Sequence, residues 1–266
     1  MLASMSYYPG GKAGDGVFQR IINLMPPHQV YIEPFFGGGA IMRLKRPARV
    51  NIGIDRDRTA LKMASLPAPA PIAQFTGRRS GSAFRATADP GGGNGEGPRG
   101  ASFFLLEGDG IGFLETYPFA GHELVYCDPP YLLSTRTRRL YKYELSDVDH
   151  RRLLRCCRSL PCKVMISGYS SVLYARELRD WHAASFPAMT RGGTERAEWV
   201  WYNFAPPVEL HDYSYLGSNF REREQIRRQK RRWQLRLERM PILRRQALLA
   251  AIAEIGSAGL RSSVVS

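Results

Sequence analysis

Four consecutive residues, Asp128, Pro129, Pro130 and Tyr131, have the groups needed to act on an aromatic amine, and they follow the apolar run at residues 124–127. The nitrogen of such an amine is a poor nucleophile because its lone pair is delocalised into the ring. A carboxylate and a backbone carbonyl that accept hydrogen bonds from the NH₂ group localise this lone pair and stabilise the developing positive charge. The prolines stiffen the turn and leave the carbonyl of Pro129 free to accept, while the ring of Tyr131 offers a stacking face. We therefore predict chemistry at the exocyclic amino group of a nucleobase; the alternative is a proline-terminated strand with a stray acid.

A glycine-rich segment earlier in the chain argues against that alternative. Glu33 and Pro34 end an apolar run and are followed by three glycines at residues 37–39. Glycines let the backbone approach a ligand closely, and the helix that we expect from about Ala40 would present its N-terminus there. A second apolar run ends at Asp55, 22 residues after Glu33, where folds of this kind hold ribose hydroxyls. The order of strand, glycines, helix, strand and acid predicts a site for a nucleoside-containing cofactor.

These segments need a scaffold that brings the ends of several strands together. Short apolar runs, each followed by Gly, Asp or Pro, occupy residues 30–35, 50–55, 102–107, 124–128 and 163–167. Amphipathic stretches with helical spacing occupy residues 14–25, 146–160 and 170–181. This alternation predicts an α/β protein with a Rossmann-like, doubly wound, mostly parallel sheet. Residues 184–189 and 199–204 predict an antiparallel pair at its edge.

The charge of the chain predicts a polyanionic partner. Its 266 residues include 38 Lys and Arg against 24 Asp and Glu, a net charge of +14. Residues 219–246 alone contain 11 basic residues and three acidic ones, and Ile226, Trp233 and Leu237 share one helical face there. We predict a basic amphipathic helix that docks on the body and contacts nucleic acid, rather than a merely solvated helix.

The domain organisation follows from composition. Residues 66–101 are rich in Pro, Gly, Ala and Ser, and we expect a flexible, low-complexity insertion that buries little. We expect a catalytic domain over residues 1–210, which includes this insertion, and a basic helical extension over residues 211–266.

Other classes of protein are disfavoured. The four cysteines lack the paired spacing of a zinc site, so we expect reduced cysteines and no metal: Cys127, Cys156, Cys157 and Cys162. Residues 1–12 lack the apolar core of a signal peptide, and the apolar run at residues 247–253 is too short to span a bilayer. We therefore expect a soluble, cytoplasmic protein with no membrane partner.

Four motifs in this order resemble those of the Dam-type DNA adenine methyltransferases, over roughly residues 6–205. The motifs are Tyr8-Pro9-Gly10-Gly11-Lys12, Glu33-Pro34-Phe35-Phe36-Gly37-Gly38-Gly39, Gly53-Ile54-Asp55 and Asp128-Pro129-Pro130-Tyr131. Residues 167–169 and 198–203 resemble segments of phage-borne members of this family. The resemblance implies the class I fold of S-adenosylmethionine-dependent methyltransferases, S-adenosylmethionine as cofactor, and adenine in double-stranded DNA as target.

The resemblance also implies roles for individual residues. Asp55 would hold the ribose hydroxyls, Asp109 would lie near the cofactor adenine, and Asp128 would contact both cofactor and target amino group. The implied cofactor-binding residues are Tyr8, Lys12, Glu33, Pro34, Phe36, Gly37, Gly39, Asp55, Asp109 and Asp128. The implied catalytic residues are Asp128, Pro129, Pro130 and Tyr131.

Sequence recognition is where this chain departs from better-known members, which have a sizeable recognition region before the Asp-Pro-Pro-Tyr motif. Here the low-complexity residues 66–101 occupy that place, and 18 residues lie between Asp109 and Asp128. We therefore expect a short or relaxed sequence preference. The arginines that we expect to grip the duplex are Arg136, Arg138, Arg139, Arg227, Arg228, Arg231 and Arg232.

Several alternatives remain open from the sequence. The same motif is compatible with methylation of the amino group of cytosine, or of adenine in RNA. Both restriction-modification and protection of a phage genome are also compatible with it. A second alternative is a basic nucleic-acid-binding protein without catalysis, which would not need these four residues intact: Lys12, Asp55, Asp128 and Tyr131. A dinucleotide oxidoreductase would need a Gly-x-Gly-x-x-Gly turn between its first strand and the following helix, and the glycine run at residues 37–39 does not have this spacing.

Overall fold

The structure is a computed structural model that describes residues 12, 14, 16–68, 70–75, 100–136, 138–189 and 195–262, with side chains up to residue 255. Tyr8 and most of the expected insertion lie outside these residues. The chain divides into two compact units, Met1–Tyr215 and Leu216–Ser266, which are described separately.

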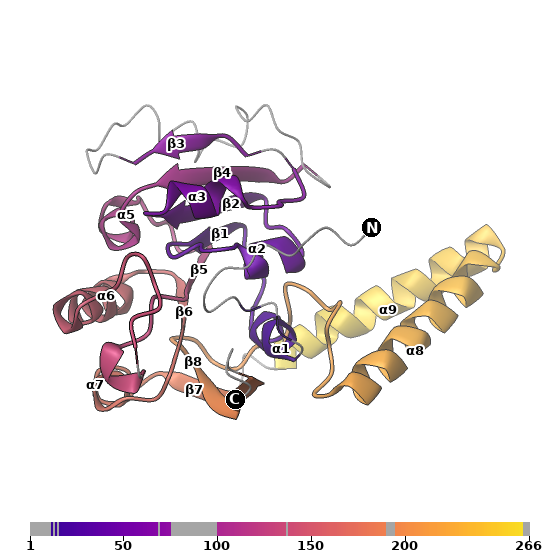
Figure 1. Ribbon diagram of the computed structural model, residues 1–266. Helices are drawn as coiled ribbons and strands as arrows, with labels where there is room; N and C mark the ends of the chain where they lie inside the picture. The colour runs from indigo at the N-terminus through magenta and orange to yellow at the C-terminus, as the bar shows by residue number, and fades with distance from the viewer. Residues whose placement is uncertain are drawn as a thin grey trace. The chain divides into compact units, whose positions relative to one another are not determined.

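The first unit contains an eight-stranded sheet in the order β3-β4-β2-β1-β5-β6-β8-β7 (Figure 1). The strands are β1 Val30–Glu33, β2 Val50–Asp55, β3 Ile72–Gln74, β4 Ser102–Glu107, β5 Glu123–Cys127, β6 Lys163–Gly168, β7 His182–Met189 and β8 Glu195–Tyr202. Strand β8 is antiparallel to both of its neighbours, and all other pairs are parallel. From β1 the order runs to β2 on one side and to β5 on the other. In open α/β sheets such a switch point opens a ligand-binding crevice at the carboxyl ends of the strands.

Helices cover both faces of this sheet, so the central strands are buried throughout. The helices are α1 Val17–Ile22, α2 Ala40–Leu44, α3 Arg58–Lys62, α5 Gly110–Thr116, α6 Asp147–Ser159 and α7 Val172–Glu177. In β1, Ile32 packs in one core cluster with residues of α5, α6 and α7, whereas Tyr31 packs in a second cluster with residues of α1, α2 and α3. This two-layer core confirms the predicted Rossmann-like, doubly wound fold.

The strand predictions are confirmed with small shifts, and the antiparallel pair is present. However, β8 lies between β6 and β7, so β7 forms the edge of the sheet. The reason is the burial of β8, whose last three residues, Val200, Trp201 and Tyr202, belong to the core.

The segment at residues 66–101, expected to be a flexible insertion, contains one strand that the sequence did not predict. Strand β3 pairs in parallel with β4, and Ala68 and Ala101 are buried in the core. The remainder of the segment, residue 69 and residues 76–99, lies outside the described residues.

The second unit contains two helices where the sequence predicted one over residues 219–246. Helix α8 spans Phe220–Glu238 and α9 spans Ile242–Ser262. The break falls at Pro241, because proline disfavours helical geometry in the residue before it. Asn219 begins α8 by accepting a hydrogen bond from the N–H of Glu222. None of the described side chains of this unit is buried, and the predicted docking of α8 on the body stays a prediction.

Two findings bear on the classes considered above. In the described part of the chain, no helix combines the length and apolar character that a membrane crossing requires. All four cysteines are buried and form no disulfide, and no cluster of metal-ligating side chains occurs among the described residues.

Candidate active site

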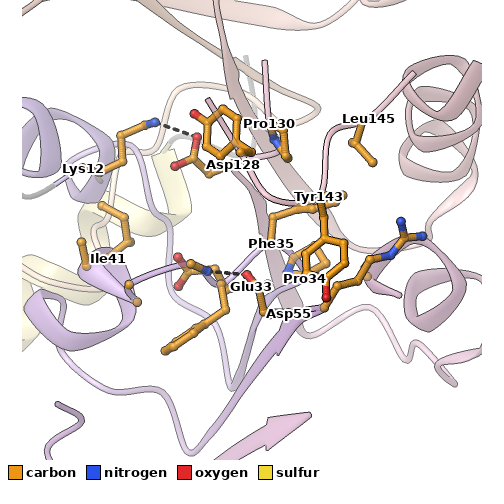
Figure 2. Close-up of a pocket in the computed structure, with 18 of the residues that line it drawn as sticks. Lys12, Glu33, Pro34, Phe35, Ile41, Asp55, Asp128, Pro130, Tyr143 and Leu145 are labelled. Carbon is orange, nitrogen blue, oxygen red and sulfur yellow. Dashed lines mark hydrogen bonds and ion pairs between the residues drawn. The ribbon is translucent and has the colours of Figure 1, made fainter. Parts of the chain in front are cut away.

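A cavity lies at the switch point of the sheet, where β1, β2 and β5 end (Figure 2). It brings together every described residue of the predicted cofactor set: Lys12, Glu33, Pro34, Phe36, Gly37, Gly39, Asp55, Asp109 and Asp128. Pro130 also lines it.

The glycine turn and Asp55 form one hydrogen-bonded unit on the floor of the cavity. The N–H of Gly37 donates to Oδ2 of Asp55 at 2.7 Å, and the N–H of Asp57 donates to Oδ1 at 2.8 Å. Burial raises the pKa of Asp55, although both backbone donors oppose this. Gly39 has a φ of 61°, and a Cβ there would lie 2.2 Å from the ring of Phe36. The turn therefore needs glycine at this position, and Asp55 fixes its shape.

Lys12 links Asp128 to Tyr131 at the other side of the cavity. Its Nζ lies 2.6 Å from Oδ1 of Asp128 and donates to the hydroxyl of Tyr131 at 2.6 Å. The same ammonium group is 3.5 Å from Oε1 of Glu198, which accepts a very short hydrogen bond from Tyr131. Burial raises the pKa of Tyr131, and the carboxylates of Asp128 and Glu198 raise it further. Two carboxylates, one ammonium group and one phenol thus form a buried network.

Glu33 lies beneath the same end of the cavity. Its side chain is 3 % exposed, and Tyr31 donates a hydrogen bond to it at 3.3 Å. Burial raises the pKa of Glu33 to about 8, and the nearby carboxylate of Asp128 contributes to the rise. A cationic ligand group next to Glu33 would favour its ionised form.

A loop that follows Tyr131 reaches over the cavity. Tyr141 and Tyr143 line the cavity from this loop, and Lys142 forms an ion pair with Asp57 at 3.2 Å. Glu144 anchors the loop, because it accepts hydrogen bonds from the guanidinium of Arg136 and from the backbone N–H groups of Leu140 and Tyr141. Partial burial works against the carboxylate, but these donors lower the pKa of Glu144 to about 2.

Asp109 has a structural role in addition to its place in the cavity. Its carboxylate caps α5 by accepting from the N–H groups of Ile111 and Gly112, and it pairs with Arg56 at 2.9 Å and Arg152 at 3.4 Å. Arg56 also lines the cavity.

Residues 113–190 match the model of the D12 class N6 adenine-specific DNA methyltransferase family. The match includes Asp128-Pro129-Pro130-Tyr131 and confirms the family resemblance predicted from the motifs. Together with the sheet topology, it supports a methyltransferase. A comparison with the curated proteins found no match.

Solved structures of methyltransferases are similar at low identity. Magnesium protoporphyrin IX methyltransferase from Synechocystis PCC 6803 is 11% identical with a TM-score of 0.37, covering 70% of this chain and 75% of that chain. Precorrin-6y C5,15-methyltransferase from Geobacter metallireducens GS-15 is 8% identical with a TM-score of 0.39, covering 76% of this chain and 95% of the other. An rRNA methylase from Streptococcus thermophilus is 11% identical with a TM-score of 0.37, covering 71% and 92%. These likenesses are distant, and the fold rests on the sheet topology described above.

The arginines predicted to contact DNA differ in their surroundings. The side chain of Arg136 is 5 % exposed and forms an ion pair with Glu144, so its charge holds the loop in place. Arg138 and Arg139 are exposed on that loop. In α8, Arg227 and Arg228 are exposed and pair with Glu224, and two further arginines, Arg231 and Arg232, are also exposed. Contact of these residues with DNA stays a prediction.

The residues of the site that sequence reasoning missed include Glu198, Tyr141, Tyr143 and Arg56. For Glu198 the sequence holds a signal, because it is an acid next to the apolar run at residues 199–202 of a strand. Buried carboxylates need partners, so such an acid indicates a polar contact inside the protein.

Proposed function

We propose that this protein transfers a methyl group from S-adenosylmethionine to the exocyclic amino group of adenine in DNA. The observation that carries the proposal is the turn from Asp128 to Tyr131, which lies at the end of β5 beside the cavity and within the segment that matches the adenine methyltransferase family.

S-adenosylmethionine is the cofactor, in agreement with the sequence prediction and the family match. The groups around the cavity fit this cofactor, which is a nucleoside with an amino-acid tail. An acidic side chain is available for each of its three parts: the ribose, the adenine and the methionine end. Asp55 would accept from the ribose hydroxyls, Asp109 and Arg56 would flank the adenine, and Glu33 would face the cationic methionine end. When bound, this cofactor supplies an electrophilic methyl group.

The residues around Asp128 prepare the acceptor nitrogen. Among the hydrogen bonds of the described residues, Asp128 uses Oδ1, toward Lys12. Its Oδ2 would accept from the target amino group together with the carbonyl of Pro129, which keeps the lone pair on nitrogen. Pro130 holds the turn rigid, and the ring of Tyr131 would contact the base once it leaves the duplex.

The rest of the chain would grip the duplex. We assign catalysis to residues 1–210 and phosphate contacts to the helical extension over residues 211–266, together with Arg138 and Arg139 of the loop. Phosphate contacts raise affinity without reading sequence, so we expect a short or relaxed sequence preference.

Methylation of defined substrates tests the proposal. The full chain is incubated with S-adenosylmethionine and either unmethylated plasmid DNA or RNA, and the nucleosides are then analysed by mass spectrometry. We expect N6-methyladenine in DNA, and sequencing of the methylated adenines measures the sequence preference. Methylated cytosine, or methylated adenine in RNA alone, would replace the proposed acceptor with another. A lack of product on every substrate would overturn the proposal.

Asp128 variants show whether the site is the one described. Asp128→Ala removes both acceptor oxygens, and the isosteric Asp128→Asn keeps one oxygen for Lys12 but places an amide donor where Oδ2 would accept from the target amino group. Both variants should lower turnover by at least about 100-fold. DNA binding should survive in both. Asp147→Ala, which removes an exposed acid from the first turn of α6, is the matched control and should retain full turnover.

A further inference from the structure

Two side chains of β8 each contact a tyrosine near the cavity. Glu198 accepts the hydrogen bond of the Tyr131 hydroxyl, and the guanidinium of Arg196 lies 4.5 Å from the ring centroid of Tyr169. Arg196 and Glu198 are two positions apart, so their side chains share a face of the strand. The two tyrosine rings meet edge to face, 4.7 Å apart. One face of β8 therefore holds this aromatic pair.

The burial of Glu198 needs an explanation, because packing alone would favour an apolar side chain. Glu198 is 4 % exposed, whereas Glu195 at the start of the same strand is exposed. A buried carboxylate is unfavourable unless it is hydrogen-bonded and paired with a charge. Both conditions are met here by Tyr131 and by the ammonium group of Lys12, 3.5 Å away.

This arrangement links Glu198 to Asp128 through Tyr131 and Lys12. Lys12 donates to the Tyr131 hydroxyl and to Oδ1 of Asp128, so that hydroxyl lies between Glu198 and Lys12. If the hydroxyl turned away from Glu198, Lys12 would lose one of its partners and could shift away from Asp128. The orientation of Asp128 thus depends on a hydrogen bond that begins at β8.

We propose that Glu198 is a positioning residue, which fixes the Tyr131 hydroxyl and, through Lys12, the orientation of Asp128. It does not contact the substrate. The inference rests on the proposed function, since Asp128 is the acceptor of the amino-group hydrogen bond in that reaction.

A double-mutant cycle tests whether Glu198 acts through Tyr131. Glu198→Gln keeps the shape but removes the charge, and should lower kcat roughly 10- to 100-fold, the range of one charge-assisted hydrogen bond. Tyr131→Phe removes the hydroxyl that transmits the effect. In that background, Glu198→Gln should lower kcat by less than about threefold. The KM for S-adenosylmethionine should change little, and Glu195→Gln, the same substitution on the same strand, should be silent.

A measurement without turnover separates this inference from the proposed function. In protein with ¹³C-labelled tyrosine Cζ, the Tyr131 signal is the one missing from Tyr131→Phe. It should shift in Glu198→Gln and not in Glu195→Gln. If the wild-type protein methylates no DNA, the proposed function fails, while this signal still decides whether Glu198 holds Tyr131.

Three results would overturn the inference: wild-type kcat in Glu198→Gln, a full additional loss in the Tyr131→Phe background, or an unchanged Tyr131 signal. Thermal melting shows whether each variant is folded. Should Glu198→Gln not fold, Glu198→Asp, which keeps the charge but shortens the side chain, is placed in the same cycle and should show the same dependence on Tyr131.

Discussion

The ammonium group of Lys12 and the carboxylate of Asp128 lie 2.6 Å apart, although 116 positions separate them in the sequence. Burial disfavours the charged ammonium group, but the carboxylates of Asp128 and Glu198 outweigh it and raise the pKa of Lys12 above its ordinary value. Lys12 therefore stays charged at neutral pH. Without it, the buried carboxylate of Glu198 and the partly buried carboxylate of Asp128 would lose the cation that pairs with both, which is destabilising. The first glycine-rich motif and the catalytic turn are thus one electrostatic unit.

The turn of Asp55 leads to a prediction about cofactor binding. Asp55→Ala should weaken S-adenosylmethionine binding about 10- to 100-fold, because charge-assisted hydrogen bonds to the ribose are lost. The variant also frees the N–H groups of Gly37 and Asp57, so Asp55→Asn provides a comparison that keeps an acceptor for one of them. Calorimetry on folded variants measures both affinities. Unchanged binding in both would remove Asp55 from this role.

The raised pKa of Glu33 leads to the prediction that cofactor binding depends on pH. Burial raises its pKa to about 8, so the free protein holds a proton on this carboxyl at neutral pH. A cationic ligand end favours the ionised form, and binding below pH 8 would release that proton. Affinity should therefore rise as the pH increases from 6 to 8, by up to about tenfold per pH unit.

Glu33→Gln provides the control for this linkage. Since glutamine cannot titrate, any pH dependence that remains in the variant belongs to the ligand or to other groups. Proton release is measured directly by calorimetry in buffers of different ionisation enthalpy. Equal proton release in wild type and Glu33→Gln would contradict the prediction.

How much of the site was predictable depends on which residues follow strands. Glu33, Asp55 and Asp128 each come at the end of a parallel strand, and parallel strands end at one edge, so their meeting could be predicted from the sequence. Glu198 reaches the same place from an antiparallel strand, and its contact with Tyr131 depends on the pairing of β8 with β6. That pairing joins residues 31 to 37 positions apart, and local periodicity does not encode its register.

Loop and helix boundaries were harder to predict for local reasons. Arg136 was expected to contact DNA because it lies in an arginine-rich loop, but Glu144, eight residues later, binds it. The sequence contains both residues without showing that the loop closes between them. Pro241, by contrast, does signal the end of α8. The prediction of one helix over residues 219–246 rested on the net charge of that segment and did not use this proline.

The lowered pKa of His150 leads to a prediction about how the stability of the protein depends on pH. It is fully buried, its Nδ1 lies 3.0 Å from the Tyr174 hydroxyl, and burial lowers its pKa to about 4. The unfolded chain takes up a proton near pH 6.5, whereas the folded protein does so only near pH 4. Stability is therefore lost as the pH falls from 6.5 to 4, and this histidine accounts for about 2 kcal/mol of the loss at pH 5.

The contribution of His150 is isolated by substitution. Urea unfolding at pH 7.5 and pH 5 should show a difference in unfolding free energy that is smaller by about 2 kcal/mol in His150→Asn than in the wild type. His182→Asn, at an exposed position of the edge strand β7, should leave the difference unchanged. An equal pH difference in the wild type and His150→Asn would show that other groups cause the acid sensitivity.

The exposed arginines of α8 lead to a prediction about salt. Each phosphate that a protein neutralises contributes about −0.9 to the slope of log affinity against log salt on duplex DNA. Replacing four arginines of α8 by Gln, which also favours helix, should flatten this slope by up to about 3.6 and raise the KM for DNA. The positions are Arg227, Arg228, Arg231 and Arg232. Turnover at saturating DNA should change little, because these side chains belong to a unit separate from the cavity.

A matched variant separates direct contact from net charge. It replaces four exposed arginines on α6 and α7 and just beyond, again by Gln, and so removes the same charge from the first unit. These positions are Arg151, Arg155, Arg176 and Arg179. If α8 contacts phosphates, the α8 variant flattens the salt slope far more than this one, because only contacts that neutralise phosphates release counterions. Equal slopes for the two variants would mean that α8 acts only through the overall charge of the protein.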